Sequence, residues 1–274
     1  MRSFIVPTDF SQNAQHASAY ALQLAKQLHT KVILMHAFEE PVSVSEYEIS
    51  NVQFYNMKDH ILKRLEDMKE DLESRFGNDV PIELAVFNND LVGNIKILYD
   101  DPDARLIVIG LTGAGMANFF LGSNTLKIVN NIERAVLTVP PYANFRPVKK
   151  IVFATDMWNV AETVPAKRIK RIVELLQAEL LVLSIQKPQQ PSPELEAEKE
   201  MLAKKLQGLP YTFHEISKRN RVTGIKDFAR EQKADLIAIV PEKYDFLENL
   251  LKTNHTKAML FKSGIPILTL PPEK

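Results

Sequence analysis

Apolar residues near the start of the chain form two patterns that alternate. FIVP at 4–7 and KVILMHAF at 31–38 are short continuous apolar runs, typical of strands buried on both faces of a parallel sheet. Between them, apolar residues recur at spacings of three and four, the period of one helical face. We therefore predict strand, helix and strand, with Ser11 as the helix N-cap. The buried helical face would consist of Ala14, Ala17, Ala21, Leu24 and Leu28.

The same alternation continues to residue 139. A longer helix carries an apolar stripe with charged residues elsewhere, and it is followed by further short apolar runs. The stripe comprises Ile61, Leu65, Met68, Leu72 and Phe76. The later elements are predicted as a strand at 80–87, a helix at 91–100, a strand at 105–109, a helix at 123–132 and a strand at 135–139. This βαβαβαβαβ order predicts a doubly wound parallel sheet.

The second half of the chain repeats the landmarks of the first half in the same order. FIVPTD at 4–9 returns as IVFATD at 151–156, and VLTVPP at 136–141 returns as ILTLPP at 267–272. The proline-rich seam at 140–150 lacks apolar periodicity, as a linker should. We therefore predict two homologous domains, residues 1–143 and 148–274. The fold class is α/β, with two doubly wound five-stranded parallel sheets.

The final strand of each half is an apolar edge strand. These strands are AVLTV at 135–139 and PILTL at 266–270. An exposed apolar edge invites pairing unless it is covered. We predict that the two halves pack through these strands as an intramolecular pseudo-dimer.

Composition narrows the classes of function. Lys and Arg together number 34, as do Asp and Glu, so no overall charge favours nucleic acid or an anionic membrane as a partner. The chain has no cysteine, which excludes disulfides and thiolate metal sites. It shows neither a signal peptide nor an apolar span of membrane length. We expect a cytoplasmic protein with no nucleic-acid or membrane partner.

The candidate site lies where the winding of the first sheet reverses. In a sheet of order 3-2-1-4-5, ligands bind beyond the carboxyl ends of strands one and four. Asp9 follows strand one, and GLTGAGMANFFLGSNT at 110–125 follows strand four with four of the chain's nine glycines. Glycines let main-chain N–H groups approach an anion, and a helix beginning at Ser123 favours negative charge. A polyphosphate fits this pattern.

Better-known nucleotide and metal motifs do not fit the chain. There is no GxGxxG after strand one, and Gly110-x4-Gly115 is followed by Met116 where a P-loop needs lysine. The six histidines show no metal-binding spacing such as HExxH. The pattern therefore supports neither NAD binding nor P-loop chemistry, and we predict no metal ligand.

Taken together, PTDFS at 7–11 and the glycine pattern ending in Gly122-Ser123 resemble the universal stress protein family in its tandem form. The resemblance covers both halves and implies an adenine nucleotide α-hydrolase-like fold with ATP as the cofactor, with or without Mg²⁺. It departs from the family between Gly113 and Gly122, where the chain is one residue shorter than usual. The nucleotide contacts that it implies are Pro7, Thr8, Asp9, Ala37, Gly110, Gly113, Gly122, Ser123 and Asn124.

The second half lacks the glycine loop. At the matching place the chain reads VPEKYDFLENLLKT at 240–253, with no glycine and three added carboxylates. Carboxylates repel phosphates in a partly desolvated site. We expect one ATP per chain, in the first half, and a second half that serves as a structural copy or binds a protein partner, including a second copy of the chain.

Three functions stay open at this stage. The segment from Gly110 to Leu126 holds no charged residue and no histidine, so binding without efficient turnover fits better than a dedicated ATPase, and we predict no catalytic residue. The alternatives to an ATP-binding signalling module in the stress response are a slow ATPase or phosphotransferase, and a scaffold that binds no nucleotide. Each candidate residue also has a purely structural interpretation that needs no ligand. Gly110 and Gly113 can be turn residues, Asp9 can help to start the first helix, and His36 can be a hydrogen-bonded core residue.

Overall fold

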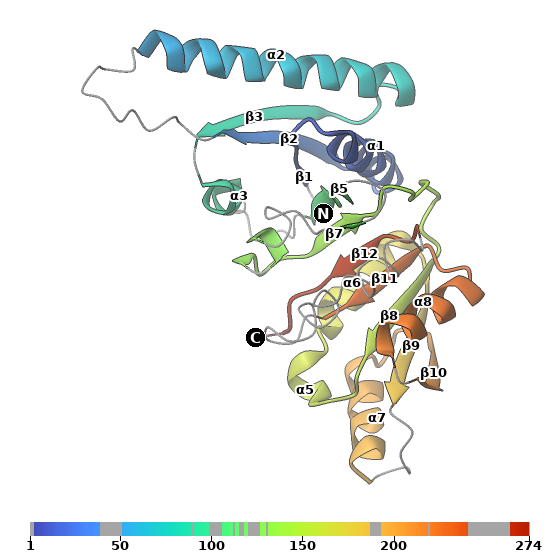
Figure 1. The fold of residues 1–274 in the computed structure, drawn as a ribbon. Coiled ribbons are helices and arrows are strands. Elements are labelled where there is room, and N and C mark those ends of the chain that lie inside the picture. The colour runs from blue at the N-terminus through green and yellow to red at the C-terminus, as the bar shows by residue number, and fades with distance from the viewer. Residues whose placement is uncertain are drawn as a thin grey trace.

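The computed structural model of the chain contains one large sheet with helices on both faces (Figure 1). The structure describes residues 3–38, 51–88, 90–98, 106–111, 113–114, 118–119, 127–129, 131–186, 193–218, 220–240 and 264–273.

The elements of the first half alternate as the sequence predicts. Its strands in the large sheet are β1 (Ser3–Pro7), β2 (Lys31–Phe38), β3 (Ile82–Asn88), β4 (Leu106–Gly110) and β7 (Val136–Val139). Its helices are α1 (Gln12–Gln27), α2 (Asn51–Phe76) and α3 (Leu91–Leu98). The sequence pattern did not predict a small hairpin of two-residue strands, β5 (Gly113–Ala114) and β6 (Asn118–Phe119).

The second half has the same alternation. Its strands are β8 (Lys150–Thr155), β9 (Glu179–Gln186), β10 (Tyr211–Ser217), β11 (Leu236–Ile239) and β12 (Ile267–Thr269). Its helices are α5 (Val160–Thr163), α6 (Ala166–Leu176), α7 (Pro193–Lys205) and α8 (Arg221–Glu231). Pro165, between α5 and α6, separates two helices where the first half has the single helix α1.

The strand order confirms the predicted fold class. The ten-stranded sheet runs β10-β9-β8-β11-β12-β7-β4-β1-β2-β3, so each half has the order 3-2-1-4-5. In this ten-stranded sheet the neighbouring strands of each half are parallel, and only β12 and β7 pair antiparallel. The carboxyl ends of β1 and β4 therefore lie side by side, as the candidate site requires.

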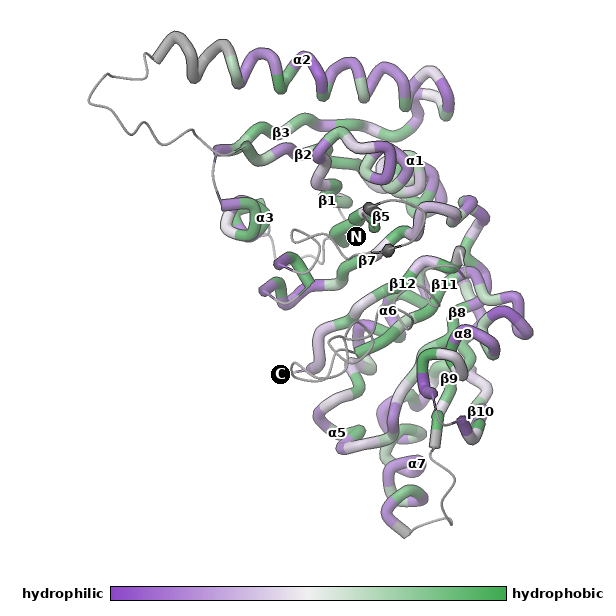
Figure 2. The backbone as a smooth tube through the Cα atoms, viewed as in Figure 1, coloured by the Kyte–Doolittle hydropathy of each residue, from purple (hydrophilic) through white to green (hydrophobic). Residues whose placement is uncertain are grey.

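Helices cover both faces of the first half's sheet, and successive residues of a strand point to opposite faces. Phe4 and Val6 point into a core shared with α1 and α2, whereas Ile5 joins a smaller core with Ile95 of α3. The predicted stripe of α2 is buried from Ile61 to Leu72, and Phe76 is half-buried. Figure 2 shows hydrophobic colouring along most of the strands and hydrophilic colouring over much of α2. Burial of the strands on both faces explains their continuous apolar runs.

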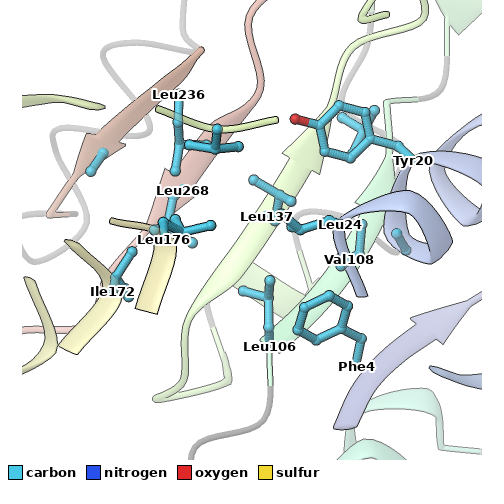
Figure 3. Close-up of a cluster of buried hydrophobic side chains, with 14 of the residues drawn as sticks. Phe4, Tyr20, Leu24, Leu106, Val108, Leu137, Ile172, Leu176, Leu236 and Leu268 are labelled. Carbon is cyan, nitrogen blue, oxygen red and sulfur yellow. The ribbon is translucent and has the colours of Figure 1, made fainter. Parts of the chain in front are cut away.

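The two halves join through their final strands, which confirms the predicted pseudo-dimer. Leu137 of β7 lies opposite Leu268 of β12, and their exposed fractions are 1% and 3%. Leu24 of α1 and Leu176 of α6 lie beside this pair, so both halves contribute to one apolar cluster (Figure 3). The joint is therefore both a strand pairing and a shared core.

The linker between the halves packs against the first half. The side chain of Gln27 donates a hydrogen bond from Nε2 to the carbonyl oxygen of Val148 (3.3 Å), and the Val148 amide donates to Gln27 Oε1 (3.0 Å). The Phe145 ring meets the Tyr20 ring edge to face, with centroids 5.2 Å apart. The linker lacks apolar periodicity because single side chains anchor it, not one face of a helix or strand.

Replacing Leu268 by alanine is expected to lower the free energy of unfolding by about 2–4 kcal/mol, because it leaves a cavity in the shared core. Ile97→Ala on α3 is the control, since Ile97 is 64% exposed and its truncation should cost less than about 1 kcal/mol. Urea unfolding of both variants measures the difference. Equal losses would contradict the placement of Leu268 in the joint.

Candidate functional site

The turn after β1 holds Asp9 in a defined position. The amide of Phe10 donates to Thr8 Oγ1 (3.0 Å), and the amide of Ser11 donates to Asp9 Oδ1 (3.0 Å). Phe10 has a φ of 63°, in the left-handed region. Ser11 Oγ then accepts from the Ala14 amide (3.2 Å), which confirms Ser11 as the N-cap of α1. The Asp9 side chain is exposed at the carboxyl edge of the sheet, with one carboxylate oxygen engaged by the turn.

The second half contains the same turn after β8. The Met157 amide donates to Thr155 Oγ1 (3.2 Å), the Trp158 amide donates to Asp156 Oδ1 (3.1 Å), and Met157 has a φ of 58°. The repeated Thr-Asp pair thus has a structural reason that operates in both halves. Its recurrence alone says nothing about ligands.

The two aspartates differ in what surrounds their second carboxylate oxygen. Asp156 Oδ2 lies 3.8 Å from the Arg221 guanidinium, and its side chain is only 15% exposed. Arg221 is the first residue of α8, whereas the corresponding helix of the first half, α3, begins with Leu91. Among the residues that the structure describes, no cation makes an ion pair with Asp9. Of these two turn carboxylates, only Asp9 therefore lacks an ion-pairing cation in the described structure.

The structure brings the other edge residues of the first half close to this turn. β1 pairs with both β2 and β4, which places Ala37 and Gly110 on the two sides of the Thr8-Asp9 turn. Ala37 and Pro7 are half-buried, and Thr8 is buried. Main-chain and side-chain groups from three strands therefore converge at one edge.

Gly110 has a packing reason of its own. A Cβ atom built on Gly110 would lie 2.4 Å from the carbonyl oxygen of Asn13 and 2.8 Å from its carbonyl carbon. The start of α1 therefore approaches the end of β4 more closely than any side chain permits. The glycine is required by the contact between helix and sheet, independently of any ligand.

The glycine loop is described only in part. Gly113 begins β5 and pairs antiparallel with Phe119 of β6, so part of the loop forms a hairpin. The chain is helical at 127–129, within the predicted helix. Gly122, Ser123 and Asn124 lie outside the described residues, so the predicted helix start at Ser123 is not described.

Two side chains beside the turn complete its surroundings. His36 donates from Nδ1 to the Thr8 carbonyl oxygen (2.7 Å), since a carbonyl can only accept, so the reading of His36 as a hydrogen-bonded residue is correct. The guanidinium of Arg64, on α2, lies 3.9 Å from the centroid of the Phe10 ring. Sequence analysis missed Arg64, whose only signal was its position next to the buried stripe of α2. It brings a cation to an edge whose glycine loop carries none.

The described parts of the chain contain neither a candidate metal cluster nor a candidate membrane-spanning helix. No group of three or more Asp, Glu or His side chains there could hold a metal ion. No described helix has the length and apolar character needed to cross a membrane.

The chain was also compared with known proteins. A model of the universal stress protein family matches residues 1–140. A comparison with curated proteins found no sequence match.

Similar solved structures cover nearly the whole chain. A universal stress protein from Archaeoglobus fulgidus DSM 4304 is 14% identical, with a TM-score of 0.67 over 98% of each chain. A protein from Pseudomonas aeruginosa UCBPP-PA14, described as a universal stress protein, is 15% identical, with a TM-score of 0.54 over 99% of this chain and 94% of that one. The cytoplasmic domain of a prokaryotic cation chloride cotransporter is 10% identical, with a TM-score of 0.53 over 98% and 94%. At these identities the similarity is one of fold, and function has to be argued from the site.

Proposed function

Because this chain belongs to the universal stress protein family, we propose that its first half binds one ATP between the carboxyl ends of β1 and β4 and that the protein acts as a binding and signalling module in the stress response. The observation that carries the proposal is the difference between Asp9 and Asp156. Both hold the same turn, but Arg221 compensates only the second carboxylate in the described structure. Asp9 keeps an oxygen available to accept a hydrogen bond from a nucleoside.

The residues at the edge of the first half fit an adenine nucleotide. Pro7, Thr8, Asp9 and Ala37 would contact the adenosine. The main chain of the glycine loop would bind the phosphates, with Gly110, Gly113, Gly122, Ser123 and Asn124 as its proposed residues. Arg64, next to Phe10, adds a positive charge at the same edge. Bound ATP would change the charge and shape of this edge, and a protein partner could distinguish the ATP-bound form from the free form.

The proposal assigns the two halves different tasks. Residues 1–143 would form the nucleotide-binding domain, and residues 148–274 a domain without a nucleotide site. In the second half the ends of β8 and β11 enclose a cavity of only about 30 Å³, lined in part by Asp156 and Arg221. A cavity of this volume is far too small for a nucleotide. The second half then contributes the joint and a surface for a partner.

A scaffold that binds no nucleotide is the second candidate. It is favoured by a specific observation: both the Thr8-Asp9 turn and Gly110 already have structural reasons, so neither requires a ligand. A slow ATPase is the third alternative. Equilibrium binding separates the scaffold from the other two, and single-turnover kinetics with Mg²⁺ separates binding from hydrolysis.

Calorimetry of the full-length chain with ATP is expected to give one site with a micromolar dissociation constant, which corresponds to a binding free energy of about −8 kcal/mol. Asp9→Asn should weaken ATP binding at least about tenfold, because it replaces a charged hydrogen-bond acceptor with a neutral amide. Asparagine keeps an oxygen for the Ser11 amide, so the turn should persist.

Asp156→Asn is the matched control, since it makes the same change in the same turn of the other half and should leave ATP affinity unchanged. Two equivalent sites would refute the asymmetry between the halves. An absence of binding at about millimolar ATP would support the scaffold.

A further inference from the structure

A basic hollow of about 280 Å³ lies at the joint between the halves. It is formed where α1, the linker, the end of α8 and the segment before β12 meet. We define it by Tyr20, Tyr142, Asn144, Arg146, Arg230 and Lys233. Because β12 runs antiparallel to β7, the amino ends of β11 and β12 lie at the edge where β7 ends and the linker begins. The hollow therefore belongs to neither strand-end crevice.

The described lining of the basic hollow carries three cations and one carboxylate, so positive charge is in excess. Arg146, Arg230 and Lys233 are exposed, and none of them has an ion-pair partner among the residues described. Over the whole chain Lys and Arg balance Asp and Glu at 34 each, so three unpaired cations around one hollow are a local excess. Such a concave cluster attracts anions.

The carboxylate in the described lining is already engaged. Asp235 Oδ2 accepts hydrogen bonds from the main-chain amides of Lys149 and Lys150, both at 3.0 Å. These two contacts tie the start of β8 to the start of β11. Asp235 therefore serves the main chain, and it leaves the three cations free to meet a ligand.

Neutral polar groups complete the lining. Burial, and after it the charge of Asp235, raise the pKa of the Tyr20 phenol, so its hydroxyl stays protonated and able to donate a hydrogen bond. Figure 3 shows the Tyr20 oxygen turned toward the second half. Gly264, with a φ of 70°, lets the segment before β12 approach the Tyr142 carbonyl oxygen, which a Cβ would meet at 3.2 Å. This close approach forms one wall of the hollow.

We propose that the basic hollow is a second anion site of this protein, which binds a compact phosphate compound at the joint between the halves. Two guanidinium groups and one ammonium group suit phosphoryl oxygens, because arginine binds them with paired donors and lysine as a point charge. The volume lies just below the range of sites for drug-sized ligands, so the ligand is small. The glycine loop plays no part in this site.

Calorimetry of the full-length chain with inorganic pyrophosphate at low ionic strength tests the proposal, and binding is expected. The double variant Arg230→Gln, Lys233→Asn should weaken it at least about tenfold, since two charge-assisted contacts are lost. Asparagine is chosen for Lys233 because the residue has a φ of 53°, which asparagine tolerates. Asp235→Asn should bind pyrophosphate more tightly, because it removes a negative charge and keeps an acceptor for the two amides.

Lys204→Gln is the matched control. Lys204 is exposed in the last turn of α7, outside the lining, and its substitution removes one charge without touching the hollow. Unchanged melting of the double variant shows that it is folded. Three results would overturn the anion site: no binding of pyrophosphate, pyrophosphate binding weakened as much by Lys204→Gln as by the double variant, or loss of pyrophosphate binding in Gly122→Val.

Parallel titrations with inorganic phosphate, pyrophosphate and glycerol phosphate identify the source of the phosphoryl group. Tighter binding of the inorganic ions indicates a free ion as the ligand, and tighter binding of glycerol phosphate indicates an ester. Either order supports the anion site, provided that the double variant weakens binding of the preferred ion or ester at least about tenfold.

Discussion

Replacing Gly110 by alanine is expected to lower the free energy of unfolding by about 3 kcal/mol or more. The added Cβ would lie 2.4 Å from the main-chain oxygen of Asn13, and a main-chain atom cannot move aside as the end of a side chain can. The variant must therefore shift the start of α1 away from β4 or tilt the strand. For a chain of this length the melting temperature should fall by roughly 6–12 °C, which differential scanning calorimetry measures.

Gly224→Ala in α8 is the matched control for Gly110→Ala. A Cβ at Gly224 would also be tight, 3.1 Å from the Ile185 Cδ1 atom and 3.3 Å from the Ile216 Cδ1 atom, but both are ends of flexible side chains. Alanine also favours the helix over glycine by about 1 kcal/mol. Stability should therefore change by less than about 1 kcal/mol. A Gly110→Ala variant as stable as Gly224→Ala would refute the close approach between α1 and β4.

Replacing Gly122 by valine is expected to weaken ATP binding at least about 100-fold and to leave the fold intact. Gly122 stands directly before Ser123, where the sequence predicts the start of a helix that faces the phosphates. A β-branched side chain there would fill the space of a phosphate and would disfavour a positive φ. Calorimetry gives the affinity, and circular dichroism checks the fold. A variant that binds ATP like the parent and has an unchanged spectrum would refute a phosphate role for this loop.

The two glycine substitutions separate packing from binding. Gly110→Ala should destabilise the protein whether or not ATP is present, because its contact is with Asn13. Gly122→Val should weaken ATP binding and leave the stability of the protein unchanged. If both variants lost stability equally, the glycine loop would be a packing device in its entirety.

The sequence pattern predicts the fold well because burial leaves a strong signal in it. Strands covered on both faces, such as β2, become continuous apolar runs, and α2 shows the helical period. The repeated Thr-Asp and Pro-Pro landmarks place corresponding strands in the two halves. Apolar edge strands with nothing else to cover them predict the joint, which the pairing of Leu137 with Leu268 confirms.

The site was less predictable because it depends on contacts between distant segments. Nothing in the sequence indicates that Gly110 touches Asn13, that Arg64 stacks on Phe10, or that Arg221 reaches Asp156. Each of these contacts is set by the rotation and sliding of a helix over the sheet. Local periodicity shows which face of a helix is buried, but it does not show which residue on that face meets a given strand end.

The antiparallel pairing of β7 with β12 makes an association between two copies into an event within one chain. Pairing of separate one-domain subunits obeys mass action and weakens on dilution, whereas a linker of about ten residues maintains a high effective concentration of one half around the other. In a symmetric homodimer a substitution appears in both subunits, but here it appears in one half only. The chain can therefore keep glycines after β4 while it carries carboxylates after β11. It can likewise keep the neutral Leu91 in the first half while Arg221 lies next to Asp156 in the second half. Neither difference requires a change in the strands that join the halves.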